Sequence, residues 1–345
     1  MSSQARPLLQ KSIVVDGLFH SLLIDPPPAD GRKDTVDLLL AGGVNIINGT
    51  VILDFYRNDF PTYCRELYRF FVLEEACPEK VLLVRSYADL LQAKREGKLG
   101  VILSMQGADA LEHDLRYVAL LHRLGVRLIQ ITYNQRNNLG CGVFEPQDTG
   151  LTRFGQQAIY EMNRLGIVID LSHVGHQTSL DAIEVSRDPV VFSHCGVKAL
   201  NPHKRNLTDE QIRAVAAKGG MVGLCPHSVM CMKDRGTRPT ADDFIDQIKH
   251  VADLVGEDHV GIGTDRWMRP TLAYKLVRTE FERTLPGFFG EFSGEEKHVA
   301  GFNYYDEWES LVDHLLRRSF SDAQIEKILG GNFCRVFRQV WEKGR

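Results

Sequence analysis

Short apolar runs alternate with amphipathic segments along most of the chain. Eight runs are rich in β-branched residues and bounded by polar or glycine residues, as buried parallel strands are. They are residues 12–17, 42–51, 99–106, 126–133, 165–173, 189–194, 221–225 and 259–265. Apolar residues recur at helical spacing between them, at 54–76, 86–96, 111–124, 151–165, 175–186, 208–220 and 241–255. The pattern predicts an α/β fold in which strands and helices alternate.

The number of repeats indicates how the sheet closes. Strand–helix–strand crossovers are almost always right-handed, which leaves a closed barrel or an open doubly wound sheet. Eight units favour the (β/α)8 TIM barrel. We predict one such domain across 1–345, with closing helices at 308–320 and 321–341. An aromatic-rich insertion at 266–306 is expected either to cover the site as a lid or to pack on the barrel or on a partner subunit.

Composition narrows the class of protein. The chain is 43% hydrophobic and 25% charged, with a formal net charge of −4. It has no basic run, so nucleic acid is not an expected partner. It also lacks an apolar run long enough to span a membrane and the apolar core of a signal peptide. Its seven cysteines are scattered, which is typical of reduced thiols. We therefore expect a cytoplasmic protein without membrane or nucleic-acid partners.

Two neighbouring predicted strands end in the same dipeptide, Ser-His. His173 and His194 are separated by about the length of one strand–helix–strand step. Both imidazoles are therefore expected at the carboxyl-end face, where a TIM barrel carries its active site. Two neutral imidazoles that converge there form a candidate metal site. Either histidine alone could instead be satisfied by hydrogen bonds, but the repeated pattern favours the metal.

Other polar residues follow the remaining strands, namely His20, Gln106, Tyr133 and Asp265. A metal-activated hydrolase needs ligands and a base, and Asp265 could be either a base or a third ligand. The alternative for Asp265 is a helix cap or an ion pair with the adjacent Arg266. Gln106 offers only a neutral amide oxygen, which is a weak ligand, or a hydrogen bond within the barrel mouth.

A basic loop follows the sixth predicted strand. Its Arg205 could hold a substrate carboxylate through two parallel hydrogen bonds, or it could simply be solvated. His176 and His203 are expected at the surface rather than as ligands.

These motifs, taken in order, resemble the membrane (renal) dipeptidase family of the metal-dependent amidohydrolase superfamily. The resemblance implies a (β/α)8 barrel, a homodimer and two bridged zinc ions that hydrolyse dipeptides, often with a D-residue on the carboxyl side. It also implies that His173 and His194 bind one zinc, that Asp265 is the strand-eight aspartate and that Arg205 grips the substrate carboxylate. The pieces that carry it are Gly125-Val-Arg-Leu128, Tyr133-Asn134, Gly150-Leu-Thr-Arg-Phe-Gly155, Glu161-Met-Asn-Arg-Leu-Gly166, Asp170-Leu-Ser-His-Val-Gly175, Phe192-Ser-His194, Arg205-Asn206, Gly261-Ile-Gly-Thr-Asp265 and Gly331-Asn332.

The chain departs from the family pattern at the other zinc. The family's Asp-Gly-His-x-Asp is here Asp16-Gly-Leu-Phe-His20, so Leu18 replaces a histidine ligand and His20 aligns with an aspartate. The bridging glutamate is Gln106. A neutral amide does not offset the repulsion between two dications, which disfavours a binuclear centre. We therefore expect one divalent metal, with zinc as the first candidate, on His173, His194 and Asp265, joined by His20 or Gln106.

Two functions remain open. The first is a one-metal hydrolase of a dipeptide or another small carboxylate-bearing amide, with Asp265 as base and Tyr133 helping to bind and polarise the substrate. Ordinary dipeptidase turnover is then expected to be weak. The second is a descendant of the family that binds or converts another ligand in the same pocket. A nicotinamide-dependent oxidoreductase is disfavoured because no GxGxxG pattern opens a helix near the start.

Overall fold

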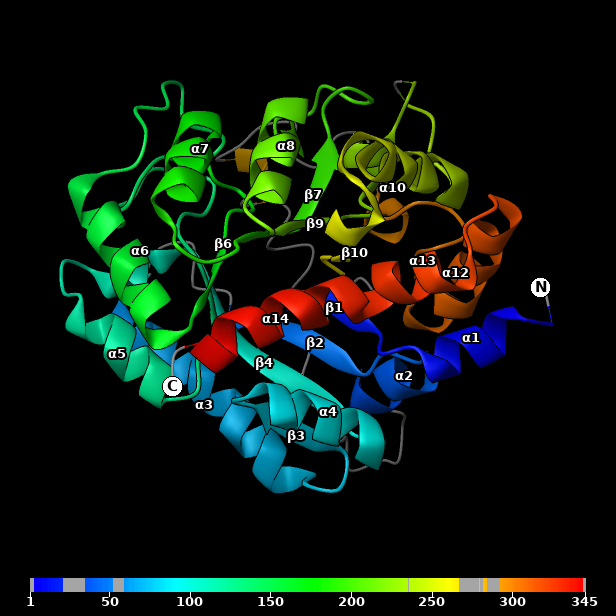
Figure 1. The fold of residues 1–345 in the computed structure, drawn as a ribbon, viewed down its shortest axis with the longest axis horizontal. Coiled ribbons are helices and arrows are strands. Elements are labelled where there is room, and N and C mark those ends of the chain that lie inside the picture. Colours follow the sequence, from blue (N-terminus) through cyan, green and yellow to red (C-terminus); the bar gives the residue numbers. More distant parts are fainter. Residues whose placement is uncertain are drawn as a thin grey trace.

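The barrel predicted from the strand pattern is present in the computed structural model, which describes residues 3–20, 35–51, 59–234, 236–266, 279, 282–283 and 292–343. Eight parallel strands follow one another in the order β1–β2–β4–β5–β6–β7–β9–β10 (Figure 1). The Asp265 N–H donates to the Leu18 carbonyl (3.1 Å) and brings the last strand back to the first, so the barrel is nearly closed. Its strands are β1 (Val15–His20), β2 (Ile46–Val51), β4 (Leu99–Gln106), β5 (Leu128–Gln130), β6 (Val168–Asp170), β7 (Val191–Val197), β9 (Met221–Leu224) and β10 (Val260–Ile262).

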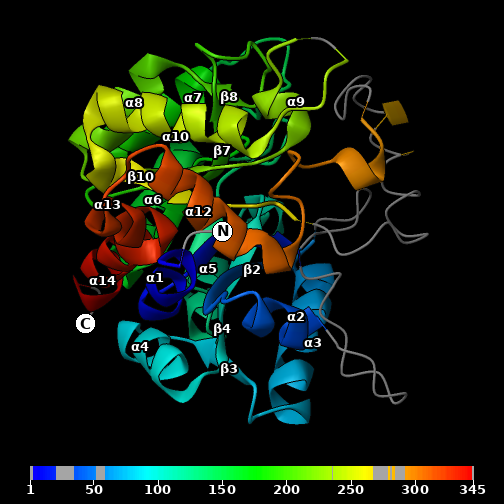
Figure 2. The same ribbon diagram turned by 90° about the vertical axis from the view of Figure 1, so that its right-hand side faces the viewer.

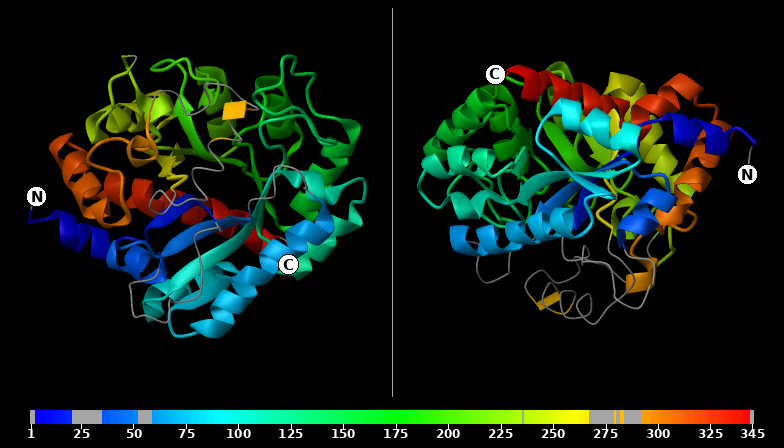
Figure 3. Two further views of the ribbon diagram at one scale, coloured as in Figure 1. Left: turned by 180° about the vertical axis from the view of Figure 1, so that it is seen from behind. Right: turned by 90° about the horizontal axis from the view of Figure 1, so that it is seen from below.

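Helices surround the strands (Figures 1 and 3). Several begin at the capping residues that their sequences provide. Thr208 accepts the Gln211 N–H while the Gln211 side chain accepts the Thr208 N–H, a reciprocal capping box. Gly166, which ends the helix at Arg153–Leu165, adopts a left-handed conformation with φ of 72°. The described helices are α1 (Ala5–Lys11), α2 (Thr35–Ala41), α3 (Phe60–Ala76), α4 (Tyr87–Glu96), α5 (Arg116–Arg123), α6 (Arg153–Leu165), α7 (His176–Val185), α8 (Asp209–Ala217), α9 (Ser228–Cys231), α10 (Ala241–Val255), α12 (Trp308–Arg317), α13 (Asp322–Glu326) and α14 (Asn332–Lys343).

Two short strands add to the predicted set. β3 (Val81–Val84) pairs with the first half of β4. β5 pairs with the second half of β4, along the same edge. β8 (Asn206–Leu207) pairs with β7. The predicted helix at 111–124 is also divided, because a 3-10 turn at Ala108–Leu111 precedes α5. Such short elements depend on pairing with a neighbour rather than on a periodic pattern of their own.

The C-terminal helix α14 closes the amino-end face of the barrel (Figure 1). Its apolar side chains pack on the first inward-facing residues of the strands, in a fully buried cluster. The members of this cluster include Val15, Ile46, Leu128, Val168, Val191, Met221, Phe333, Val336, Phe337 and Trp341. Because this face is filled by apolar packing, the polar strand ends gather at the opposite, carboxyl-end face.

Replacing Phe333 with alanine should therefore lower the free energy of unfolding by about 3–5 kcal/mol, because a fully buried ring would leave a cavity under the barrel. Urea unfolding followed by circular dichroism measures this. Gln339→Ala, on the exposed side of the same helix, is the matched control and should change stability little. Equal stability of the two variants would contradict the role given to α14.

The aromatic-rich insertion is described only at its later end. Of the aromatic residues behind the lid prediction, Trp267, Phe288 and Phe289 lie outside the described residues, whereas Phe292, Tyr304 and Tyr305 are described. The segment 292–303 packs on the barrel beside α9 (Figure 2). Its backbone is tied to the loops after β9, because the Ser228 N–H donates to the Lys297 carbonyl (2.7 Å) and the Val299 N–H to the Pro226 carbonyl (2.9 Å). This packing places residues 297 and 298 at the barrel mouth.

Two predictions from composition can be compared with the described residues. All seven cysteines are thiols outside any disulfide, and six of them are buried. None of the described helices has the length and apolar character needed to cross a bilayer.

Candidate active site

His173 and His194 meet at the carboxyl-end mouth, as the Ser-His pattern predicts. Their Nε2 atoms lie 2.9 Å apart, and both residues are buried. His173 follows β6, and His194 lies on the neighbouring strand β7. The prediction that these imidazoles converge is therefore confirmed.

The protonation of each ring is set by the partner of its Nδ1 atom. His173 Nδ1 lies 2.7 Å from Asn134 Oδ1, an acceptor, so this nitrogen carries the hydrogen. His194 Nδ1 lies 2.8 Å from Ser193 Oγ. The Ser193 hydroxyl donates to Asp170 Oδ2 (2.5 Å), so it accepts from His194 Nδ1. Both rings consequently present an unprotonated Nε2 lone pair to the same point.

Asp170 organises the backbone that carries both histidines. Its Oδ1 accepts the N–H groups of Ser172 and Ser193, each at 2.9 Å. The Ser172 hydroxyl in turn accepts the His194 N–H at 3.0 Å. The serine that precedes each histidine therefore serves to orient the site, a role that the repeated dipeptide did not reveal.

The donor atoms around these rings fit one divalent metal. Two Nε2 lone pairs this close repel each other, and a shared cation relieves that repulsion. Burial, followed by the charge of Arg205, lowers the pKa of both histidines well below the usual value, so both imidazoles are neutral at pH 7, as metal ligands must be. The Gln106 amide nitrogen lies 3.4 Å from each Nε2, which places this amide beside the same point. Within the described residues, no three His, Cys, Asp or Glu side chains form a metal-binding group.

Asp265 belongs to a second, adjacent group. One carboxylate oxygen is hydrogen-bonded to His20 Nε2, and the other lies 3.5 Å from Lys297 Nζ. Burial alone would raise the pKa of Asp265, but Lys297 and His20 outweigh it and hold the pKa well below the usual range. Burial lowers the pKa of His20, so a neutral imidazole donating Nε2–H accounts for its contact with Asp265. Burial lowers the pKa of Lys297 while the charge of Asp265 raises it, and Lys297 is the cation that faces this carboxylate.

A second divalent metal does not fit this group. Leu18 is buried and offers no liganding atom, His20 is directed onto Asp265, and Gln106 is uncharged. The only carboxylate that the described residues bring to this point already faces an ammonium group. Liganding atoms and negative charge are thus both too few for two dications.

Arg266 is not the ion partner that the adjacent position suggested. It donates to the carbonyls of Phe302 (2.9 Å) and Tyr304 (2.6 Å) and thereby anchors the chain after the insertion. Asp265 does form an ion pair, but its cation is Lys297 and not Arg266. Sequence reasoning missed Lys297 because Glu295-Glu-Lys-His298 has the composition of a solvated charged loop.

Two of the site residues adopt a backbone conformation that is uncommon outside glycine. His173 has φ of 64° and Asp265 has φ of 49°, and only two other non-glycine residues of the described part have positive φ. Such conformations cost about 1–3 kcal/mol each and persist where the surrounding structure enforces them. Their presence at both groups supports a functional site at this end of the barrel.

Arg205 is buried and directed toward the mouth, so the solvated-loop alternative is wrong. Arg205 is only 4% exposed, and its Nη2 donates to the His194 carbonyl at 3.0 Å.

The Tyr133 ring stacks on His173, with 4.3 Å between ring centroids. Burial raises the pKa of Tyr133, so its hydroxyl remains protonated at neutral pH. His176 is exposed, as expected, whereas His203 is partly buried and its Nδ1 accepts the Arg205 N–H at 3.2 Å.

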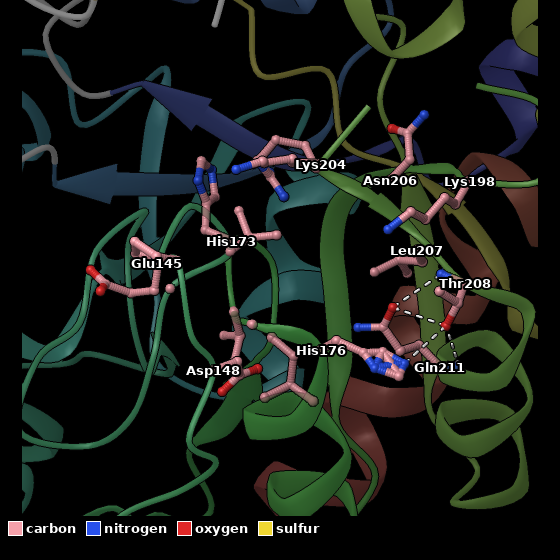
Figure 4. Close-up of a pocket in the computed structure, with 17 residues that line it drawn as sticks. Glu145, Asp148, His173, His176, Lys198, Lys204, Asn206, Leu207, Thr208 and Gln211 are labelled. Atoms are coloured by element: carbon pink, nitrogen blue, oxygen red, sulfur yellow. Dashed lines mark hydrogen bonds between the residues drawn. The ribbon is translucent and has the colours of Figure 1, made fainter. Parts of the chain in front are cut away.

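A pocket of about 350 Å³ adjoins this site (Figure 4). His173 and Arg205 line it together with Lys198 and Lys204, and Glu145 stands near His173. The three cationic side chains outnumber the two acidic ones, Glu145 and Asp148, and this excess of positive charge suits a ligand that carries a carboxylate.

The contact to Asn134 gives a direct test of the proposed orientation. Asn134→Ala should lower the metal affinity of the site about 10–100-fold, because His173 loses the acceptor that fixes its tautomer. Competition with a chromogenic chelator measures this affinity. Asn138→Ala, which removes only an amide that donates to the Glu112 carbonyl, is the control and should leave the affinity unchanged. Equal affinities would refute the assigned tautomer.

Comparison with known proteins agrees with this geometry. The model of the membrane dipeptidase family, peptidase family M19, matches residues 63–268 and 285–344. Dipeptidase tcpJ of Claviceps purpurea is 29% identical over 269 residues, which cover 77% of this chain and 57% of that protein. An uncharacterized dipeptidase of Schizosaccharomyces pombe is 29% identical over 252 residues, 72% of this chain and 54% of that protein. The chain thus spans little more than half the length of these curated relatives.

A solved structure extends the similarity to nearly the whole chain. An amidohydrolase from Pseudomonas aeruginosa is 33% identical and superimposes with a TM-score of 0.86, covering 98% of this chain and 99% of that one. The barrel, the ordered motifs and the family match lead to one assignment: this chain belongs to the membrane dipeptidase family, peptidase family M19.

Proposed function

We propose that this protein hydrolyses the amide bond of a dipeptide, or of another small amide that carries a carboxylate, with one divalent metal ion. The family consists of metallopeptidases, which implies a divalent metal and a hydrolase of the dipeptidase type. The observation that carries the proposal is the pair of Nε2 lone pairs of His173 and His194, 2.9 Å apart beside the buried Arg205. Zinc is our first candidate because it favours imidazole ligands.

Five side chains at the mouth have a role in this proposal. His173 and His194 hold the metal, whose chemistry is the activation of water and the polarisation of a carbonyl. Arg205 binds the substrate carboxylate and thereby positions the amide. Tyr133 donates its hydroxyl hydrogen to the substrate carbonyl. Asp265 accepts a proton from the attacking water and returns it to the leaving nitrogen.

The surroundings of Asp265 limit the expected rate. A carboxylate whose pKa is held well below its usual range is a weak base at neutral pH. The second metal site, which would share the polarisation of the carbonyl, lacks its ligands. Turnover of ordinary dipeptides is therefore expected to be low.

The missing ligands of a second metal site also support the second candidate, a family member that binds or converts a different ligand. Protein purified without chelator would first be analysed for metal by inductively coupled plasma mass spectrometry. It would then be assayed on L,L and L,D dipeptides and on N-acyl amino acids. One metal with measurable hydrolysis supports the hydrolase. No metal and no hydrolysis would favour the binding protein, whereas kcat/KM of about 10⁴ M⁻¹s⁻¹ or more would show unaltered dipeptidase chemistry.

Arg205→Ala should raise KM for a carboxylate-bearing substrate by the equivalent of about 2–5 kcal/mol, because a buried guanidinium contact is lost. Steady-state kinetics on the best substrate found above measure this, and a substrate analogue without the carboxylate should lose much less. Arg213→Ala, which removes a guanidinium on the exposed side of α8, is the matched control and should leave KM unchanged. Unchanged KM in Arg205→Ala would assign carboxylate binding to another residue.

A further inference from the structure

Lys297 is a buried cation to which the reaction proposed above assigns no role. Its side chain is only 3% exposed. The ammonium group donates to the backbone carbonyl of Asp265 and lies 3.5 Å from the Oδ2 atom of the same residue. Lysine is rarely buried this deeply without a specific partner, because an ammonium group loses its hydration.

The segment around Lys297 is fixed on both sides. Besides the contacts of its backbone with the loop after β9, His298 Nε2 donates to the Thr264 carbonyl at 2.8 Å. Arg238 donates to the His298 carbonyl at 2.9 Å. The Ala241 N–H donates to the Ala300 carbonyl at 2.8 Å. The fold therefore delivers this ammonium to Asp265 from a defined direction, 32 residues away in the chain.

We infer that the Lys297 ammonium takes the place of a second divalent metal in the active site. The inference rests on the proposed one-metal site of His173 and His194 and adds the reason why a second ion is excluded. Lys297 engages one oxygen of the Asp265 carboxylate while His20 engages the other. The carboxylate that a second metal would need is thus saturated from both sides.

Electrostatics favour a lysine ammonium over a second divalent metal beside Asp265. Compared with the family pattern that the sequence resembles, three residues remove negative charge or ligands from this point. They are Leu18 and His20 on β1, and Gln106 at the end of β4. A dication brought beside the ammonium would face repulsion in a buried environment, with one carboxylate shared between them. A single positive charge on a lysine balances that carboxylate without further ligands.

Metal titration tests this independently of turnover. Chelator-stripped protein would be titrated with Zn²⁺ by isothermal calorimetry, and the bound metal counted after desalting. The wild type should hold one equivalent and bind a second only weakly. Lys297→Met, which keeps the length of the side chain and removes the charge, should bind the second equivalent at least about tenfold more tightly. Lys249→Met, which removes an exposed lysine paired with Asp253 on α10, is the matched control and should behave as the wild type.

Each outcome decides the inference. Two tight equivalents in the wild type, or the same second affinity in wild type and Lys297→Met, would overturn it. Lys297→Arg, which retains the positive charge, should keep the one-equivalent behaviour and serves if the methionine variant does not fold. A wild type that binds no metal at all would refute the proposed function, whereas one equivalent in every variant refutes only the role of Lys297. A purely structural lysine would change the melting temperature and leave the stoichiometry unchanged.

Discussion

Alanine at His194 is expected to remove the bound metal and to lower kcat/KM by about 10³-fold or more. The metal supplies several kcal/mol of charge stabilisation in a hydrolysis of this kind, and each tenfold in rate corresponds to about 1.4 kcal/mol. His194 provides one of the two imidazole lone pairs that converge at the mouth, and its ring is held by Ser193 and Asp170. Metal content and steady-state kinetics, measured on the same preparation, check both effects.

The loss must be separated from misfolding, because His194 lies on a buried strand. His194→Gln keeps a polar side chain there and removes the imidazole. It should show the same loss of metal with a melting temperature closer to the wild type. His176→Ala, on the exposed start of α7, is the control for a general effect of removing histidine. Full metal content in both His194 variants would place the metal elsewhere.

The second large effect is a gain of activity. Restoring the family residues with Leu18→His, His20→Asp and Gln106→Glu, together with Lys297→Met, is expected to raise dipeptide turnover by about 10²–10³-fold. One electrostatic contact to the reacting carbonyl is typically worth that much. The three restored side chains return ligands and negative charge, and the fourth change frees the Asp265 carboxylate from its ammonium partner.

The matched control is the triple variant that retains Lys297. If the lysine excludes the second metal, the triple variant should gain much less activity than the quadruple variant. Initial rates on L,D and L,L dipeptides with added Zn²⁺ measure the difference, and metal counting shows whether the gain accompanies a second equivalent. Equal activity of the triple variant, the quadruple variant and the wild type would show that these positions do not limit turnover.

The barrel and the paired histidines could be predicted from the sequence because both depend on local patterns. A buried parallel strand is an apolar run, and its carboxyl end is marked by the polar residue that follows. For this reason His173, His194, Gln106 and Asp265 were placed correctly at one face before their contacts were known. The closing helix was also predicted, but its apolar packing under the strands came from the fold. The short strand β3 had no such signal.

The tertiary structure alone decided how the site residues divide into two groups. It joined His20 to Asp265, 245 residues apart, and placed Lys297 against the same carboxylate. It also buried Arg205 beside His194, although the surrounding loop is polar. Periodicity in a sequence reports which face of an element is buried, whereas the partner of a charge depends on where loops from distant segments converge. The sequence alone thus determined the barrel and the convergent pair of imidazoles, and the fold determined that a lysine faces the Asp265 carboxylate.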